Sequence, residues 1–227
     1  MAKQERAGRT RQAVLLAAAD TFADAGFESA SLVDISRRAG VSKGALYFHF
    51  VSKQALADGV RTEAADTVGL AVLRALRGGG PAVQELVDLT HELARLLRED
   101  VVVRAGVLLG LGGRPADCPT GGVVAPAGSP PEPSADAWRS LTAVFRTLLD
   151  RASAAGELRP GLDRGQAAEL LTTLAAGLVL FAAESTGRLA PAAITGLWSA
   201  ALPSLVPPDR LPAYRIRAIG CPAPSAV

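Results

Sequence analysis

Apolar residues recur every three to four positions along most of the chain, and no stretch alternates apolar and polar residues as a half-buried strand does. In the first such segment Val14, Ala18 and Phe22 share one face of a predicted helix over 9–25, which Gly26 ends. The same spacing predicts further helices over 31–40, 42–48, 52–76, 81–98, 100–111, 134–155, 163–186 and 191–202. The predicted fold class is therefore all-α.

Capping residues mark where these helices begin. Side chains that can accept hydrogen bonds from free backbone N–H groups precede several of the segments, and prolines open two others. The predicted caps are Ser31, Ser42, Ser52, Ser134 and Asp163, and the opening prolines are Pro81 and Pro191. Residues 110–133 contain 12 glycines and prolines in 24 positions, which predicts a long loop, and the proline-rich tail after Pro203 is expected to be irregular.

Composition narrows the class of protein. An apolar fraction of 49% excludes a disordered chain. The longest apolar run, 170–183, is too short to span a bilayer, and residues 1–11 lack the apolar segment of a signal peptide. Cys118 and Cys221 form no paired motif, so neither a disulfide framework nor a zinc site is indicated. We therefore expect a cytoplasmic protein that has no membrane partner.

The most informative segment is 31–53, SLVDISRRAGVSKGALYFHFVSK. Its two short capped helices are separated by Gly40 and Val41, which is the helix-turn-helix arrangement, and in that motif the second helix enters the DNA major groove. Gly44 and Ala45 are small enough to let the second helix approach DNA closely. Residues 1–61 also carry nine Lys and Arg against six Asp and Glu, so the basic charge is concentrated around this motif.

Phosphate and base contacts are expected from the second helix, its caps and the flanking basic residues. Leu46 and Phe50 are assigned to the core. Tyr47 and Phe48 have a second interpretation as core aromatics, and His49 as a cap for a buried backbone group. The predicted DNA-binding residues are Arg6, Arg9, Arg11, Ser31, Ser42, Lys43, Gly44, Ala45, Tyr47, Phe48, His49 and Lys53.

AGVSKGALYFHFVSKQAL and the preceding AADTFADAGFESASLVDISRRAG resemble the DNA-binding signature of the TetR family of repressors over residues 9–60. More narrowly, MAKQERAGRTRQ, KGALYFHF and DVVVRAGVLLG resemble the γ-butyrolactone receptor branch of actinobacteria. The resemblance implies a three-helix DNA-binding domain over 1–51, a ligand-binding and dimerisation bundle over 52–205, and a tail over 206–227. It also implies a repressor of antibiotic-biosynthesis genes that releases operator DNA when a small lactone binds.

The bundle is expected to hold the effector among its larger apolar side chains, with a few hydroxyl groups to orient it. The resemblance places a pocket tryptophan near Trp138. The predicted lining residues are Leu96, Val103, Val107, Trp138, Leu141, Phe145, Thr172, Thr173 and Phe181. Because Ala175, Ala176 and Gly177 offer no hydroxyl, one alternative is a pseudo-receptor that responds to an antibiotic or a biosynthetic intermediate. Another is a small-molecule binding protein that does not bind DNA.

Segments 163–186 and 191–202 are apolar on more than one face, so each needs a covering surface. We expect a homodimer through these two helices, and its two-fold symmetry predicts a pseudo-palindromic operator. Catalysis is not expected, because His49 and His91 belong to no metal-binding motif and no nucleophile elbow or phosphate-binding loop is present. No cofactor or metal is predicted.

Overall fold

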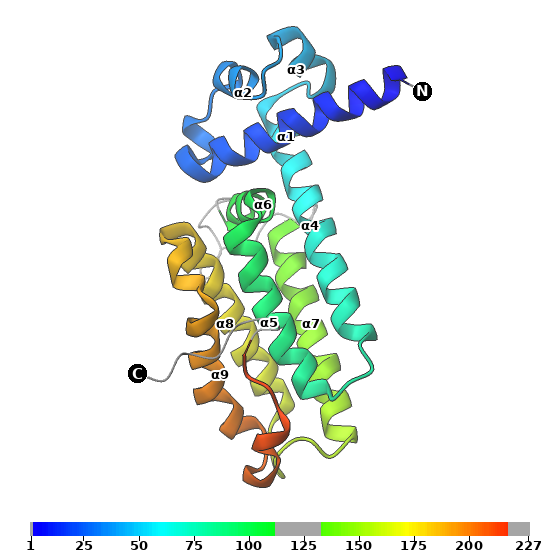
Figure 1. Ribbon diagram of the computed structural model, residues 1–227, viewed down its shortest axis with the longest axis vertical. Coiled ribbons are helices and arrows are strands. Elements are labelled where there is room, and N and C mark those ends of the chain that lie inside the picture. Colours follow the sequence, from blue (N-terminus) through cyan, green and yellow to red (C-terminus); the bar gives the residue numbers. More distant parts are fainter. Residues whose placement is uncertain (1, 112–132, 218–227) are drawn as a thin grey trace, which may run out of the picture. The chain divides into compact units, whose positions relative to one another are not determined.

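The computed structural model describes residues 2–111 and 133–217, and within these ranges the chain is helical and contains no strand, which confirms the all-α prediction. Two compact units divide the chain: Met1–Thr67 with Asp100–Ala137, and Val68–Glu99 with Trp138–Val227 (Figure 1). Most of the predicted loop over 110–133, including Cys118, and the end of the tail, including Cys221, lie outside the described residues.

The first unit is built around α1 (Ala2–Ser29), which packs against α2 (Leu32–Arg38), α3 (Lys43–His49) and α6 (Val101–Leu111). The face of α1 predicted to be apolar is buried, and Ile35 and Leu46 are fully buried in the same core. Helix α1 begins earlier than predicted, because nothing in its first turns breaks a helix and the Thr10 hydroxyl donates a hydrogen bond to the Arg6 carbonyl at 3.0 Å. Gly26, which was predicted to end this helix, kinks it with φ at 77°, and α1 continues to Ser29.

Four of the five helix caps predicted from the sequence are confirmed, whereas Ser134 is wrong as a cap because α7 (Pro133–Ala154) already begins one residue before it. The Ser31 and Ser42 hydroxyls accept hydrogen bonds from the backbone N–H groups of Val33 and Ala45, at 3.2 and 3.1 Å. Two further caps act in the same way: Ser52 at the start of α4 (Lys53–Arg77) and Asp163 at the start of α8 (Arg164–Glu184). Each cap satisfies a donor that the first turn leaves without an intrahelical partner.

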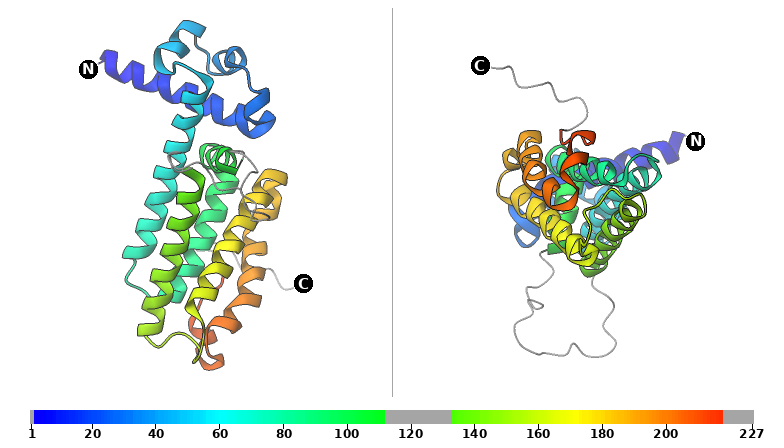
Figure 2. Two further views of the ribbon diagram at one scale, coloured as in Figure 1. Left: turned by 180° about the vertical axis from the view of Figure 1, so that it is seen from behind. Right: turned by 90° about the horizontal axis from the view of Figure 1, so that it is seen from below.

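The second unit is a helical bundle (Figure 2). It contains the end of α4, α5 (Ala82–Glu99), most of α7 (Pro133–Ala154), α8, and α9 (Pro191–Leu205). Helix α5 packs against α8 and α9 and against the 3₁₀ turn η1 (Thr186–Leu189). A second 3₁₀ turn, η2 (Pro208–Ala213), lies within the tail that was expected to be irregular. Helix α9 continues through Pro203, three residues past its predicted end.

Helix α8 is, by length and composition alone, apolar enough to cross a membrane, and in the described part of the chain no other helix is. About two fifths of its apolar window (39%) is buried inside the chain, and α8 packs against α5 and η1. Its Leu170 and Leu180 side chains are exposed. Helix α8 therefore packs into the core of its unit with one face, and its other face is apolar and exposed in the single chain.

Candidate nucleic-acid interface

Helices α2 and α3 are joined by a tight turn that requires a glycine. Gly40 has φ at 66°, a conformation that side chains with a Cβ rarely adopt. The Val41 backbone N–H donates to the Ser36 carbonyl at 3.0 Å and closes the turn. Ile35 on α2 and Leu46 on α3 are both fully buried, so one apolar contact fixes each helix to the core of the unit. This is the geometry of a helix-turn-helix.

The outward face of α3 carries aromatic and basic side chains. Phe48 is 82% exposed and Tyr47 is 42% exposed, whereas Leu46 and Phe50 are buried as predicted. The interpretation of Phe48 as a core aromatic is therefore wrong. The exposed Lys43 places its ammonium group 5.8 Å from the centre of the Tyr47 ring, and the half-buried His49 ring meets Phe48 edge to face.

The start of α3 leaves room for a close approach to DNA. A Cβ added to Gly44 would meet only the Ser42 hydroxyl oxygen, at 4.0 Å, and Ala45 is the next residue along the helix. The exposed Ser42 hydroxyl accepts the N-cap hydrogen bond, so its own proton stays available for donation to a phosphate. Ser31 caps α2 in the same manner.

Basic residues flank this face, but the structure places them differently. Arg6, Arg9 and Arg11 are exposed on α1, where Arg11 also stacks over the Phe50 ring at 5.4 Å. Lys53 was expected to meet a phosphate, yet its ammonium group donates hydrogen bonds to two backbone carbonyls of the same unit.

The residues predicted to line an effector site fall into both units. Val103 and Val107 belong to the first, and the others belong to the second. In the second unit Leu96 and Phe145 are buried, and Trp138, Leu141, Thr172 and Phe181 are half-buried. Thr173 is exposed, and its hydroxyl donates to the Glu169 carbonyl. The Arg188 guanidinium covers the Phe181 ring at 4.0 Å.

One polar contact between α7 and α8 was not predicted. The hydroxyl oxygens of Thr142 and Thr172 lie 3.0 Å apart, and each is also in reach of the carbonyl four residues earlier in its own helix, Trp138 and Ala168 respectively. Each hydroxyl oxygen has two lone pairs, and at most one of these four is used in the contact between the two threonines, so the pair keeps unused acceptor capacity. The sequence gives no signal for this contact, because the two threonines lie 30 residues apart.

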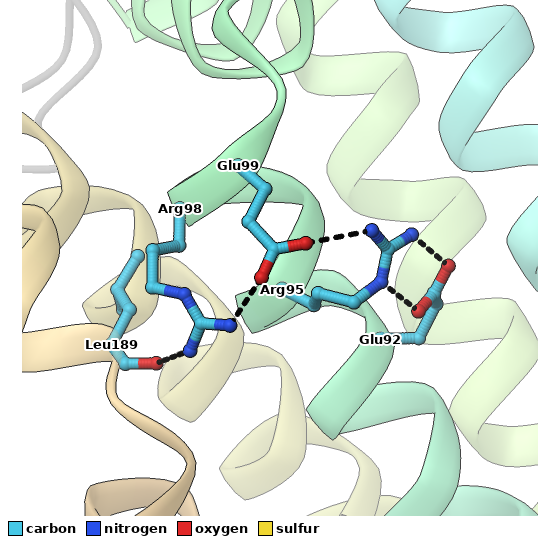
Figure 3. Close-up of polar contacts among 5 residues, drawn as sticks. All are labelled: Glu92, Arg95, Arg98, Glu99 and Leu189. Atoms are coloured by element: carbon cyan, nitrogen blue, oxygen red, sulfur yellow. Dashed lines mark hydrogen bonds and ion pairs between the residues drawn. The ribbon is translucent and has the colours of Figure 1, made fainter. Parts of the chain in front are cut away.

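The end of α5 carries a network of charged side chains (Figure 3). Arg95 contacts Glu92 through two nitrogens at 2.7 Å and Glu99 through a third at 3.0 Å. Arg98 pairs with Glu99 and donates to the Leu189 carbonyl in η1. The hydrogen-bonded carboxylates raise the pKa of Arg95, and the hydrogen bonds from Arg98 and Arg95 lower the pKa of Glu99. Among the described residues, no three His, Cys, Asp or Glu side chains gather as metal ligands would.

Residues 14–60 match the family model described as bacterial regulatory proteins, tetR family. The chain is 34% identical over 209 residues to the A-factor receptor protein of Streptomyces griseus, covering 92% of this chain and 68% of that protein. The TetR family protein CprB from Streptomyces coelicolor A3(2) is a similar solved structure, with a TM-score of 0.74, 30% identity and coverage of 92% of this chain and 94% of that one.

CprB in complex with its biological operator sequence is similar too, with a TM-score of 0.71, 31% identity and the same coverage. A structure described as a gamma-butyrolactone receptor has a TM-score of 0.70, 28% identity and coverage of 90% and 91%. The fold and the helix-turn-helix define a bacterial DNA-binding regulator. The chain belongs to the TetR family.

Proposed function

We propose that this protein is a transcriptional repressor that binds a pseudo-palindromic operator as a homodimer and is released by a small, largely apolar effector of the γ-butyrolactone type. Its target genes are those of secondary metabolism, it acts in the cytoplasm, and it has no catalytic site. The single observation that carries the proposal is the outward face of α3. There an exposed Phe48, Tyr47 and Lys43 stand on a helix whose opposite face is buried through Leu46.

The proposed DNA contacts divide by chemistry. Lys43, Tyr47, Phe48 and His49 reach base edges or phosphates from α3, while Gly44 and Ala45 let the helix backbone come close. The hydroxyls of Ser31 and Ser42 donate to phosphate oxygens from the starts of α2 and α3. Arg6, Arg9 and Arg11 neutralise phosphates beside the groove.

The proposed effector site lies in the second unit, around Trp138 on α7 and Thr172 on α8. Half-buried aromatic and apolar side chains supply contact area, and the acceptor capacity of the Thr142 and Thr172 hydroxyls gives a place for one ligand hydroxyl. The relatives described as the A-factor receptor and as gamma-butyrolactone receptors support a lactone as the effector. The alternative effector is an antibiotic or its precursor, which the absence of a hydroxyl from Ala175 to Gly177 favours.

The proposed dimer interface is the outer face of α8 and α9. Leu170, Leu180 and Leu197 are between 37% and 61% exposed in the single chain. Gly177 and Gly196 have nothing within 4 Å of an added Cβ, so a second helix can approach closely there. Helix α4 belongs to the first unit up to Thr67 and to the second from Val68, which makes it the proposed route from effector to DNA.

Operator binding by recognition-helix variants tests this function. We expect Lys43→Ala and Tyr47→Ala each to weaken binding to DNA from upstream of the protein's own gene by roughly 5- to 150-fold for each of the two half-sites, since one good base or phosphate contact is worth about 1–3 kcal/mol. Fluorescence anisotropy with non-specific competitor DNA measures the affinity, and light scattering checks the dimer. Arg74→Ala is the matched control, because Arg74 is exposed on the second-unit part of α4. Unchanged affinity in both α3 variants would contradict the assignment of α3.

A further inference from the structure

The end of α1 exposes backbone carbonyls that need donors. Gly26, at φ 77° and ψ 166°, kinks α1, which continues to Ser29, and Ala30 then leads into the Ser31 cap of α2. The last carbonyls of a helix have no intrahelical N–H partner, so a side chain or water must supply one. Here the Lys53 ammonium does so, donating to the Glu28 carbonyl at 3.0 Å and to the Ala30 carbonyl at 3.2 Å.

The ammonium group of Lys53 also contacts an aromatic ring. The Lys53 Nζ lies 4.6 Å from the centre of the Phe27 ring, which in turn packs against the buried Phe22 with the ring centres 5.7 Å apart. A cation over an aromatic face is attracted by the ring quadrupole. An ammonium group has three N–H donors, and the two carbonyls accept from two of them while the ring lies beside the group.

Through these contacts Lys53 links the start of α4 to the start of the helix-turn-helix. Lys53 is the first residue of α4, where the Ser52 hydroxyl caps the helix by accepting from the Ala55 N–H at 3.0 Å. Ala30 directly precedes Ser31, the N-cap of α2 and so the start of the helix-turn-helix. One side chain therefore ties the first turn of α4 to the corner from which α2 and α3 continue.

We propose that Lys53 is a positioning residue, which orients the helix-turn-helix through the Glu28 and Ala30 carbonyls and does not bind a DNA phosphate. This inference rests on the proposed DNA-binding function. Operator affinity then depends on Lys53 because this residue orients the helix-turn-helix. The number of phosphates neutralised by the protein does not depend on Lys53.

A matched pair of charge-removing variants tests the proposal. Lys53→Gln and Lys43→Gln each remove one positive charge from the first unit. The logarithm of operator affinity falls linearly with the logarithm of salt concentration, with a slope of about −0.9 for each phosphate neutralised. Affinities from 50 to 200 mM salt, at a temperature where circular dichroism shows each variant fully folded, give both the affinity and the slope. Lys53→Met, which keeps an unbranched side chain without the ammonium group, serves as a second variant.

We expect Lys53→Gln and Lys53→Met to lower operator affinity about tenfold with the wild-type salt slope, and to lower the melting temperature. Lys43→Gln is present twice in the proposed dimer, so it should reduce the magnitude of the slope by about 1.8, which is 0.9 for each copy, and leave the melting temperature unchanged. A slope reduced as in Lys43→Gln would overturn the proposal in favour of a phosphate contact. Wild-type affinity in the folded Lys53 variants would overturn it in favour of a purely structural role. Absence of specific binding by the wild-type protein would instead contradict the proposed function itself.

Discussion

A buried carboxylate joins three segments of the second unit. Glu157, in the connection between α7 and α8, accepts hydrogen bonds from the Ala82 and Val83 backbone N–H groups at 2.9 and 3.0 Å, and from the Tyr214 hydroxyl at 3.1 Å. It thus caps the start of α5 from a distant part of the sequence, where a negative charge is favourable for the helix dipole. The chain after η2 continues along α5, since Gln84 exchanges hydrogen bonds with the Arg215 backbone.

Replacing this carboxylate tests its structural importance. Glu157→Gln turns one acceptor oxygen into an NH₂ group that faces a buried N–H donor, so we expect a loss of about 1–3 kcal/mol in the free energy of unfolding. Urea unfolding followed by circular dichroism measures this change. Glu169→Gln is the control: it breaks the exposed pair with Arg146 and is expected to cost no more than about 1 kcal/mol. Equal effects of the two changes would show that Glu157 is not a cap.

The same carboxylate affects the Tyr214 hydroxyl. Burial and the negative charge of Glu157 raise the pKa of Tyr214 to about 12, above its ordinary value of 10. The stabilising effect of neutral Tyr214 is fully present below pH 10 and is lost as the pH rises from about 10 to 12, because the unfolded state loses this proton first. Unfolding free energies at pH 9 and pH 11 should therefore fall more for the wild type than for Tyr214→Phe. A parallel decline in both proteins would contradict this pKa.

Side-chain contacts with the backbone could be predicted from the sequence only where the two partners are close together along the chain. The caps at Ser31, Ser42 and Asp163 were predictable, because each accepts from an N–H two or three residues ahead. The hydrogen bonds of Lys53 and Glu157 were not predictable, because their backbone partners lie 23 to 75 residues away. Every residue type except proline has both a backbone N–H and a carbonyl, so no sequence pattern distinguishes the partners.

At the scale of elements, one glycine sets how closely two helices of the first unit pack. A Cβ added to Gly106 on α6 would lie 2.4 Å from the Ala64 Cβ and 3.1 Å from the Val60 carbonyl oxygen, both on α4. The Arg61 guanidinium donates to the Leu109 carbonyl at 2.9 Å beside this contact. The helix over 100–111 was predictable from its apolar residues. Its packing against α1 was not, because an apolar helix face can pack against any other apolar face.

Two glycine-to-alanine changes should therefore act in opposite directions. Gly106→Ala forces α6 and α4 apart, and we expect a loss of about 1–3 kcal/mol in the free energy of unfolding. Gly69→Ala, within α4, has nothing within 4 Å of the added Cβ, so alanine's higher helix propensity should stabilise the protein by up to about 1 kcal/mol. Thermal unfolding compares the two variants. Stabilisation by Gly106→Ala would contradict the close contact between the helices.

At the scale of the whole molecule, the proposed homodimer makes a prediction on α8. Leu180 is 61% exposed in the single chain, so Leu180→Asp should leave the fold of each chain intact but place a charge in the apolar interface. We expect monomers by light scattering and a loss of operator binding. Leu70→Asp is the control, since Leu70 is 55% exposed on α4 and should leave the dimer unchanged. A stable Leu180→Asp dimer would exclude this face of α8 as the interface.

We propose that a small effector releases the protein from its operator, and a titration of the complex with an effector measures this release. A synthetic γ-butyrolactone is added to the complex of wild-type protein and operator DNA while fluorescence anisotropy reports the bound fraction. Moving the complex from about 99% bound to 99% free requires the lactone to favour the released state by about 10⁴-fold. We expect full, saturable release by the wild-type complex and weaker release when Trp138→Ala alters the proposed site. A bound fraction that stays unchanged as the lactone concentration is raised would contradict a lactone effector.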